Sequence, residues 1–163
     1  MLAGGKAQRF GSDKAEARIG GKRLIDRVAA SLSGQTDALV VCGREDPEFT
    51  CIADRPEPGL GPLGGLCAAL HYAQTHSFKA VLSSGCDALN LPESLAEHLS
   101  GDGPGVVQSQ PVIGYWPSSL ARDLDAFIAG GGRALYGFAE HVGARLERFD
   151  PPIANVNRPE DLV

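Results

Sequence analysis

The residues best suited to chemistry lie at the start of the chain, in the stretch from Leu2 to Lys14. Gly4 and Gly5 lack a Cβ, so the backbone can take a positive φ and approach a ligand closely. Three basic side chains accompany them, namely Lys6, Arg9 and Lys14. Loop amides beside basic side chains suit a polyphosphate. A surface turn with solvated lysines fits these residue types equally well, and the spacing matches neither Gly-x-x-x-x-Gly-Lys-Ser/Thr nor Gly-x-Gly-x-x-Gly.

The distribution of charge favours a small anionic ligand over a nucleic acid. The chain has a net charge of −5, which argues against general nucleic-acid binding. Residues 1–27 carry seven basic and three acidic side chains, a net of +4, and the remainder carries −9. A local basic patch on an acidic protein would attract a small anion, although chance clustering on a solvated surface gives the same pattern.

Two carboxylates follow apolar segments of strand length. Asp54 comes after residues 50–53, and Asp87 comes just beyond residues 79–84. A carboxylate at the end of a buried strand is a natural Mg²⁺ ligand, because Mg²⁺ prefers one or two carboxylates together with phosphate oxygens. Asp87 could instead cap the following turn, and Asp54 could be a turn-forming residue.

Strand and helix patterns alternate along the chain. The strands are expected at residues 38–42, 50–53, 79–84, 106–107, 112–116 and 144–149. The helices are expected at residues 22–33, from Pro62 through Ala73, at 92–99, after a cap at Ser118 or Ser119, at 134–142, and as a closing turn at 159–162. Gly64 and Gly65 weaken the second helix by about 1 kcal/mol each, which suggests the close approach of a strand or a ligand.

This alternation predicts a three-layer α/β fold with a mostly parallel sheet, built as one domain over residues 1–163. Ligands of such sheets bind beyond the carboxyl ends of the strands, so the glycine loop, Asp54 and Asp87 could converge on one edge. A glycine-rich phosphate loop normally follows a buried strand, yet only Met1 and Leu2 precede Ala3. We therefore expect the first strand to be truncated or missing from this sequence.

The sequence resembles the molybdenum cofactor guanylyltransferases. The pattern Leu-Ala-Gly-Gly-x-x-x-Arg-x-Gly-x-x-Lys at residues 2–14 looks like their signature loop. The likeness continues in order through residues 21–24, Asp54, residues 61–65, Cys86-Asp87, Gln110-Pro111 and residues 155–162. It covers nearly the whole chain, and the ordered set is far more specific than any one of its motifs.

The resemblance implies the nucleotide-diphospho-sugar transferase fold, a Rossmann-like sheet with one antiparallel strand. It implies transfer of GMP from GTP to molybdenum-molybdopterin with release of pyrophosphate, with Mg²⁺ held by Asp87. Arg9 and Lys14 would hold the β- and γ-phosphates and stabilise the departing pyrophosphate. The residues assigned to the guanine nucleotide are Leu2, Ala3, Gly4, Gly5 and Asp54. A carboxylate at position 54 can accept from the N1–H and 2-amino groups of guanine, a donor pair that adenine lacks.

Some positions bear on the choice of nucleotide. Asn155 and Asn157 match a motif near the metal and the pterin-side phosphate, where related cytidylyltransferases tend to have Asp. Those enzymes also tend to have Leu-Ala-Ala-Gly in the loop, so both differences favour GTP. Against the family pattern, Gly43 stands where relatives often have Asn, and Ala88-Leu89 replaces the usual x-Pro after Asp87. The first departure weakens the assignment of the base, and the second suggests a reshaped loop beside the metal.

Two rival functions remain at the level of the sequence. One is a sibling nucleotidyltransferase that uses CTP or another phosphorylated acceptor, and the other is a nucleotide-binding module without catalysis. Asp87 together with Lys14 argues against the module, because binding alone does not need both. Partner chaperones of molybdoenzymes are implied by the resemblance only.

The cysteines and histidines suggest structural roles. Cys42, Cys51, Cys67 and Cys86 lack Cys-x-x-Cys spacing and stand in apolar surroundings, as reduced thiols of a cytoplasmic protein would. The four histidines, His71, His76, His98 and His141, lie in or beside predicted helices and are expected to be structural or solvated. No apolar run approaches the length of a membrane span.

Overall fold

A computed structural model of the chain describes residues 1–4, 13–157 and 161. The helices are α1 (Leu24–Ser33), α2 (Pro62–Thr75), α3 (Leu95–Leu99), α4 (Ala121–Ala129) and α5 (Leu135–His141), with 3₁₀ turns η1 (Lys14–Glu16) and η2 (Ser118–Leu120). The first five strands are β1 (Arg18–Ile19), β2 (Lys22–Arg23), β3 (Val41–Cys42), β4 (Cys51–Ile52) and β5 (Ala80–Ser83). The others are β6 (Ala88–Leu89), β7 (Gly105–Val107), β8 (Gln110–Pro117), β9 (Arg145–Glu147) and β10 (Ala154–Asn155).

The helices follow from the sequence pattern. In α1 the buried residues recur with helical spacing, and Gly34 ends the helix as expected. Pro62 begins α2 at its first position, where the missing N–H costs nothing. Helix α3 is shorter than expected, and neither Ser118 nor Ser119 caps α4 through its side chain, because both lie in η2. The expected closing turn falls mostly outside the described residues.

The strands form small mixed sheets, not the mostly parallel sheet that we expected. The four-stranded sheet has the order β5-β8-β7-β9, with antiparallel pairing of β8 to both neighbours and parallel pairing of β7 to β9. The short connection between β7 and β8 is the reason, since so few residues can only join antiparallel strands. Strands β3 and β4 pair in parallel, and β10 pairs antiparallel with β6.

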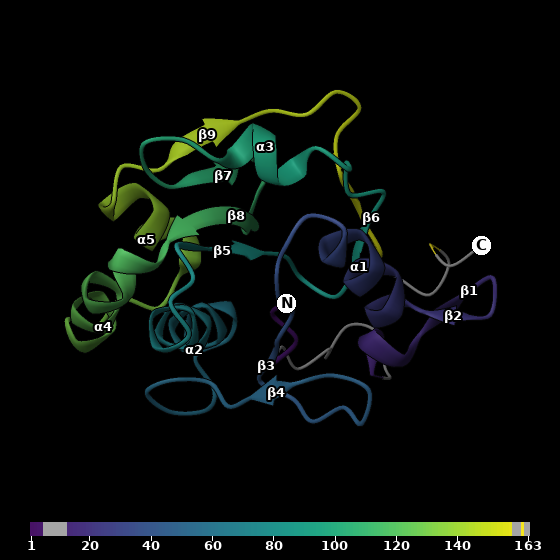
Figure 1. Ribbon diagram of the computed structural model, residues 1–163, viewed down its shortest axis with the longest axis horizontal. Helices are drawn as coiled ribbons and strands as arrows, with labels where there is room; N and C mark the ends of the chain where they lie inside the picture. The colour runs from purple at the N-terminus through teal and green to yellow at the C-terminus, as the bar shows by residue number, and fades with distance from the viewer. Residues whose placement is uncertain (5–12, 158–160, 162–163) are drawn as a thin grey trace.

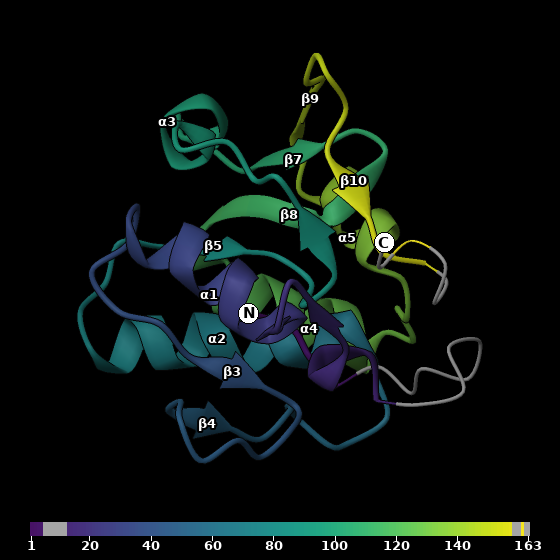
Figure 2. The same cartoon turned by 90° about the vertical axis from the view of Figure 1, so that its right-hand side faces the viewer.

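The start of the chain joins two of these sheets. Leu2 forms parallel bridges to Cys42 on one side and to Gly85 on the other. Its N–H donates to Ser84 O at 2.8 Å, and the N–H of Ala3 donates to Cys42 O at 3.0 Å. Figure 2 shows β3 and β4 set apart from β5, β8 and β7, with the N-terminus between them. Residues 1–3 therefore lie where a strand between β3 and β5 would run.

Helices cover both faces of the strands. Figure 1 shows α2 and α4 on one side of β5 and β8, with α3 on the other. Neighbouring strand residues point into different cores, because side chains alternate along a strand. Cys42 and Val106 pack with α2, α4 and α5, whereas Val41 and Val107 pack with α1 and α3. No helix among the described residues is long and apolar enough to cross a membrane.

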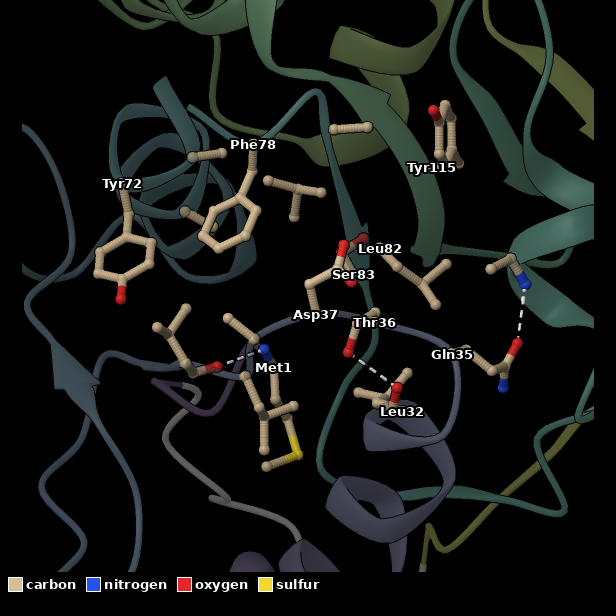
Figure 3. Close-up of a pocket in the computed structure, with 18 of the residues that line it drawn as sticks. Met1, Leu32, Gln35, Thr36, Asp37, Tyr72, Phe78, Leu82, Ser83 and Tyr115 are labelled. Carbon is tan, nitrogen blue, oxygen red and sulfur yellow. Dashed lines mark hydrogen bonds between the residues drawn. The ribbon is translucent and has the colours of Figure 1, made fainter. Parts of the chain in front are cut away.

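A cavity of about 520 Å³ interrupts the strands behind Met1. Its walls come mainly from residues 35–40 and 77–83, and Met1, Tyr72 and Tyr115 line it as well (Figure 3). The buried N-terminal amine donates to Val40 O at 2.7 Å at its edge. Because residues 38–40 border this cavity and not a paired strand, the strand expected at 38–42 is reduced to Val41–Cys42.

Candidate functional site

The candidate site lies at the carboxyl ends of adjacent parallel segments. Strands β4 and β3, residues 1–3 and β5 lie side by side, joined by the parallel pairing of β3 with β4 and by the two bridges of Leu2. Such an edge is where open α/β sheets bind ligands. The cavity behind Met1 lies toward the opposite, amino end of these segments, so it is not part of this site.

Gly4, Gly43 and Asp54 are in close contact at this edge. A Cβ on Gly4 would lie 3.0 Å from Asp54 Oδ2, and a Cβ on Gly43 would lie 2.8 Å from Asp54 Oδ1 and 2.6 Å from Gly4 Cα. Gly43 also has a φ of +81°, which L side chains rarely adopt. The glycine at position 43 is therefore required by both conformation and space. Sequence reasoning noticed the departure from Asn but missed this cause.

Asp54 is an unsatisfied carboxylate. Its Oδ1 is buried and has no hydrogen-bond partner among the described residues. Burial raises the pKa of the Asp54 carboxyl above its ordinary value, because the charged form is poorly solvated. A buried acceptor without a donor is costly, so this position suits a ligand that brings N–H groups.

Lys14 and Asp87 form an ion pair at the same edge. Lys14 Nζ donates to Asp87 Oδ2 at 2.7 Å, and the two side chains are 18% and 23% exposed. Lys14 begins η1, whose preceding residue Asp13 accepts a hydrogen bond from the Ala15 N–H. Asp87 follows β5 beyond Gly85, as the sequence predicted. Both side chains are therefore partly accessible to solvent.

The backbone segments that carry Asn155 and Asp87 lie next to each other. Strand β10 places Asn155 opposite Ala88, and the N–H of Val156 donates to Asp87 O at 3.0 Å. Asn155 Oδ1 is buried and has no partner among the described residues. Asn157 is exposed, and its N–H donates to Asp161 Oδ2 at 2.8 Å. Of the two expected pterin-side residues, Asn155 has the stronger structural tie to Asp87.

The donor atoms at this end of β6 and β10 suit a hard cation. Asp87 offers a carboxylate, and Asn155 offers a buried amide oxygen that has no hydrogen-bond partner among the described residues. Mg²⁺ takes oxygen ligands of this kind and keeps several of its waters. The Asp87 carboxylate is therefore a ligand of the type that fits a magnesium ion.

The basic patch of residues 1–27 is smaller than the sequence suggested. Arg23 is buried and its guanidinium is bound by four carboxylates. Its partners are Glu16, Asp26, Asp46 and Glu48. Arg23 is thus a structural residue and adds no free charge for a ligand.

Arg44 is a cation near the site that the sequence analysis did not identify. Its guanidinium contacts Asp13 at 2.9 Å and Glu16 at 3.1 Å, and so holds both ends of η1. Through η1 it supports the position of Lys14. The signal in the sequence was weak, because Arg44 is 28 to 31 positions away from these partners.

The other expected site residues divide into two groups. Leu2 is buried and Ala3 is half-buried between β3 and β5, so they anchor the start of the loop. Gly5 and Arg9 lie outside the described residues, and their roles remain predictions. Gly65 lies against neighbouring strand segments, since a Cβ there would lie 3.1 Å from Leu2 and 3.2 Å from Cys42.

Comparison with known proteins places this arrangement in a family. The family model of the MobA-like NTP transferase domain matches residues 1–147. The molybdenum cofactor guanylyltransferase of Cereibacter sphaeroides is 35% identical over 177 aligned residues, which cover 100% of this chain and 92% of that protein. The enzyme of that name from Rhodobacter capsulatus is 34% identical, with coverage of 100% and 91%.

Solved structures share the fold. The molybdopterin-guanine dinucleotide biosynthesis protein A of Archaeoglobus fulgidus superposes with a TM-score of 0.73 at 24% identity, covering 99% of this chain and 92% of that one. The 2-C-methyl-D-erythritol 4-phosphate cytidylyltransferase of Thermus thermophilus gives 0.71 at 15% identity, with coverage of 91% and 90%. With its strand-end glycines and acids, and with curated relatives over its full length, the chain belongs to the MobA-like NTP transferase domain family, whose members are nucleotidyltransferases.

Proposed function

We propose that this protein transfers GMP from GTP to molybdenum-molybdopterin, giving the guanine dinucleotide form of the cofactor and pyrophosphate. The names of the curated relatives support both the guanylyl group and the acceptor. The observation that carries the proposal is that the Gly4–Asp54 contact and the Lys14–Asp87 pair share one edge of adjacent parallel segments. A nucleotide would span that edge, with its base near Asp54 and its phosphates near Lys14.

Asp54 is the proposed guanine-recognition residue. Two donors of guanine, the N1–H and the 2-amino group, would satisfy a carboxylate whose Oδ1 has no partner among the described residues. Adenine presents no such pair of donors. Gly4 and Gly43 contribute by leaving space beside the carboxylate, where any side chain would collide with it.

Lys14 is the proposed phosphate-binding residue, and Arg9 is proposed to assist it. An oxygen of the acceptor's terminal phosphate attacks the α-phosphorus, a new P–O bond forms, and the bond to the β-phosphate oxygen breaks with its electron pair. Pyrophosphate leaves with added negative charge, which the Lys14 ammonium stabilises. No general base is needed, because a phosphate monoester with a second pKa of about 6 is largely ionised at neutral pH.

Asp87 is the proposed ligand of a catalytic Mg²⁺, with Asn155 as an oxygen donor near it. The ion would neutralise phosphate charge and help to align the reacting oxygens. Lys14 now holds the Asp87 carboxylate in place at 2.7 Å, so the two residues are positioned together before any substrate arrives.

We also infer that the small sheets are parts of one Rossmann-like, three-layer arrangement of the nucleotide-diphospho-sugar transferase type. Support comes from the two bridges of Leu2, which link β3–β4 to the four-stranded sheet, and from the helices on both faces. We place the reaction in the cytoplasm, since all four cysteines are free thiols, as is usual in a reducing compartment.

A nucleotide panel tests the proposal. We expect GTP with Mg²⁺ to raise Tm and to support pyrophosphate release with the molybdenum-pterin acceptor, whereas ATP and CTP do neither. A ligand at a hundredfold excess over Kd stabilises the native state by about 2.7 kcal/mol, so the shift is readily measured. Lys14→Ala should lower kcat strongly, and Lys22→Ala, on an exposed hairpin, serves as the matched control. Equal responses to all three nucleotides would contradict the guanine assignment.

A further inference from the structure

A cluster of metal-binding side chain types lies outside the proposed nucleotide site, between α2 and α4. Cys67 and His71 stand one helical turn apart on α2, and Asp125 faces them from α4. The sulfur, a ring nitrogen and a carboxylate oxygen all lie within 4.8 Å of one another. Three potential ligands of different kinds thus converge at one point on two packed helices.

The distances from Asp125 to the other two residues are close to those between ligands of a tetrahedral site. Cys67 Sγ is 3.3 Å from Asp125 Oδ1, and His71 Nε2 is 3.0 Å and 2.9 Å from the two oxygens of Asp125. Zinc binds sulfur at about 2.3 Å and nitrogen or oxygen at about 2.0–2.2 Å. Tetrahedral angles then separate the ligand atoms by roughly 3.3–3.6 Å. If the separations between these ligand atoms increased by roughly a few tenths of an ångström, a zinc ion would fit between them.

The surroundings leave room for a fourth ligand. The Cys67 side chain is buried in the core, whereas the side chains of His71 and Asp125 are 24% and 43% exposed. An ion could therefore enter from the solvent side and keep a water in the open position. Spacing of Cys and His by four residues on a helix directs both side chains to the same face.

A nucleophilic role fits the cluster less well. The Cys67 thiol donates to the Asp125 carboxylate and not to the imidazole, so the base beside it is a carboxylate, which is too weak to deprotonate a thiol readily. Burial and the neighbouring Asp125 raise the pKa of the Cys67 thiol to about 12. Such a thiol is a poor nucleophile. A cation bound here would displace the thiol proton, which passes to solvent as the metal–sulfur bond forms.

We propose that Cys67, His71 and Asp125 form a binding site for a divalent cation of the zinc type, which links α2 to α4. The mixed sulfur, nitrogen and oxygen donors select a borderline-soft ion over magnesium. This site is separate from the hard-oxygen site at Asp87. Its occupancy fixes the helix whose first turn packs against Leu2 and Asp54, so it stiffens the support of the nucleotide edge.

Arg55 is the charged neighbour that opposes binding. Its positive charge acts to lower the pKa of the Cys67 thiol and of the Asp125 carboxyl, as a competing cation would. Arg55 is exposed, so its side chain can turn away when a cation binds. Replacement of Arg55 by Ala removes the repulsion and should tighten binding.

Titration with Co²⁺, a spectroscopic substitute for Zn²⁺, tests the proposal on the full chain. We expect a sulfur-to-cobalt charge-transfer band and strong visible bands of a tetrahedral ion, at one equivalent, unaffected by excess Mg²⁺. His71→Ala and Cys67→Ser should each lower the affinity for Co²⁺ by more than 100-fold. Loss of a residue that only hydrogen-bonds a metal ligand costs roughly 10- to 100-fold, and loss of a ligand itself should cost more. Cys51→Ser, which changes a half-buried thiol elsewhere, should leave the spectrum unchanged, and Arg55→Ala should lower Kd.

Thermal unfolding gives a second measurement. Zn²⁺ should raise the Tm of the parent chain and of Cys51→Ser. It should not raise the Tm of Asp125→Asn, a change at a half-buried side chain that should leave the protein folded. Absence of the charge-transfer band at millimolar Co²⁺ would overturn the proposal. So would a band that survives in Cys67→Ser or a Zn²⁺ shift that survives in Asp125→Asn. In those cases the cluster is a hydrogen-bonded contact between helices.

Discussion

The substitution Asp54→Asn tests the proposed base recognition most directly. The Asp54 carboxylate offers two acceptors, whereas Asn offers one acceptor and one donor group. One of the two guanine donors would then face an N–H group and lose its partner. A hydrogen bond to a charged group contributes about 1.5–3 kcal/mol. We therefore expect the Kd for GTP to rise by roughly 10- to 150-fold and the Kd for ATP to change little.

Calorimetric titration of GTP and ATP, with Mg²⁺ present, measures both constants. Asp102→Asn is the matched control, because it makes the same chemical change on an exposed loop. A preference for GTP that survives in Asp54→Asn would refute the assignment of the base. Weaker binding of ATP to the same extent would also refute it, since the residue would then act on a part that both nucleotides share.

The same substitution should stabilise the protein without ligand. The pKa of Asp54 is raised in the folded state, so ionisation of this carboxyl destabilises the fold. That penalty is absent below the unfolded pKa of about 3.9, and it is fully present once the pH exceeds the raised folded value. We expect Asp54→Asn to raise Tm near neutral pH and to leave it nearly unchanged near pH 3. A neutral-pH Tm below that of the parent protein would mean that the carboxylate has a structural partner.

Three further predictions concern the site and its support. Asp87→Asn should lower the rate of pyrophosphate release by about a thousandfold in excess Mg²⁺, while GTP binding measured by calorimetry partly survives. Activity within a few-fold of the parent protein would show that Asp87 is only a turn residue. Gly43→Ala should abolish GTP binding, since its Cβ would lie 2.6 Å from Gly4 Cα. Gly21 has a similar φ of +82° but lies in open space, so Gly21→Ala should lower the unfolding free energy by only about 1–2 kcal/mol and keep GTP binding. Burial disfavours ionisation of the Asp46 carboxyl, but hydrogen bonds from the Glu48 N–H and Arg23 outweigh this effect and lower the pKa of Asp46. The ionised carboxylate therefore stabilises the fold above about pH 4, and this stabilisation is lost as the pH falls further. Acid titration of Asp46→Asn, followed by circular dichroism, should accordingly give a shallower loss of stability than the parent chain, and an unchanged slope would argue against this contribution.

Local patterns predicted the helices better than they predicted the sheets. The spacing of Leu24, Val28 and Leu32 and the position of Pro62 are local signals, and α1 and α2 formed nearly where expected. An apolar run reveals burial, but it does not reveal which neighbour pairs with it or in which direction. Hence residues 79–84 gave β5, but the pattern did not assign its antiparallel pairing with β8, although the family resemblance implied one antiparallel strand.

The site shows the same division between local and long-range information. Gly4, Asp54 and Asp87 could be selected because each follows an apolar run, and the structure brings Gly4 to Asp54 and Lys14 to Asp87. The contact of Gly43 with Gly4 depends on two separate strands lying side by side, and no local pattern encodes it. The cluster of Cys67, His71 and Asp125 was missed likewise, because Asp125 is 54 and 58 positions away from the other two.

The position of residues 1–3 between two sheets has a mechanical consequence. Asp54, the proposed base-side residue, follows β4, and Asp87, the proposed metal ligand, follows β5, so the two halves of the proposed site follow strands of different sheets. The backbone bonds from Met1, Leu2 and Ala3 act as a short seam between them, with the cavity directly behind. So few hydrogen bonds allow the two sheets to move relative to each other. A nucleotide that contacts both halves of the site would restrict this movement. Amide hydrogen exchange at Cys42 and Gly85 should therefore slow when GTP binds, because local opening between the two sheets would also have to break contacts with the nucleotide.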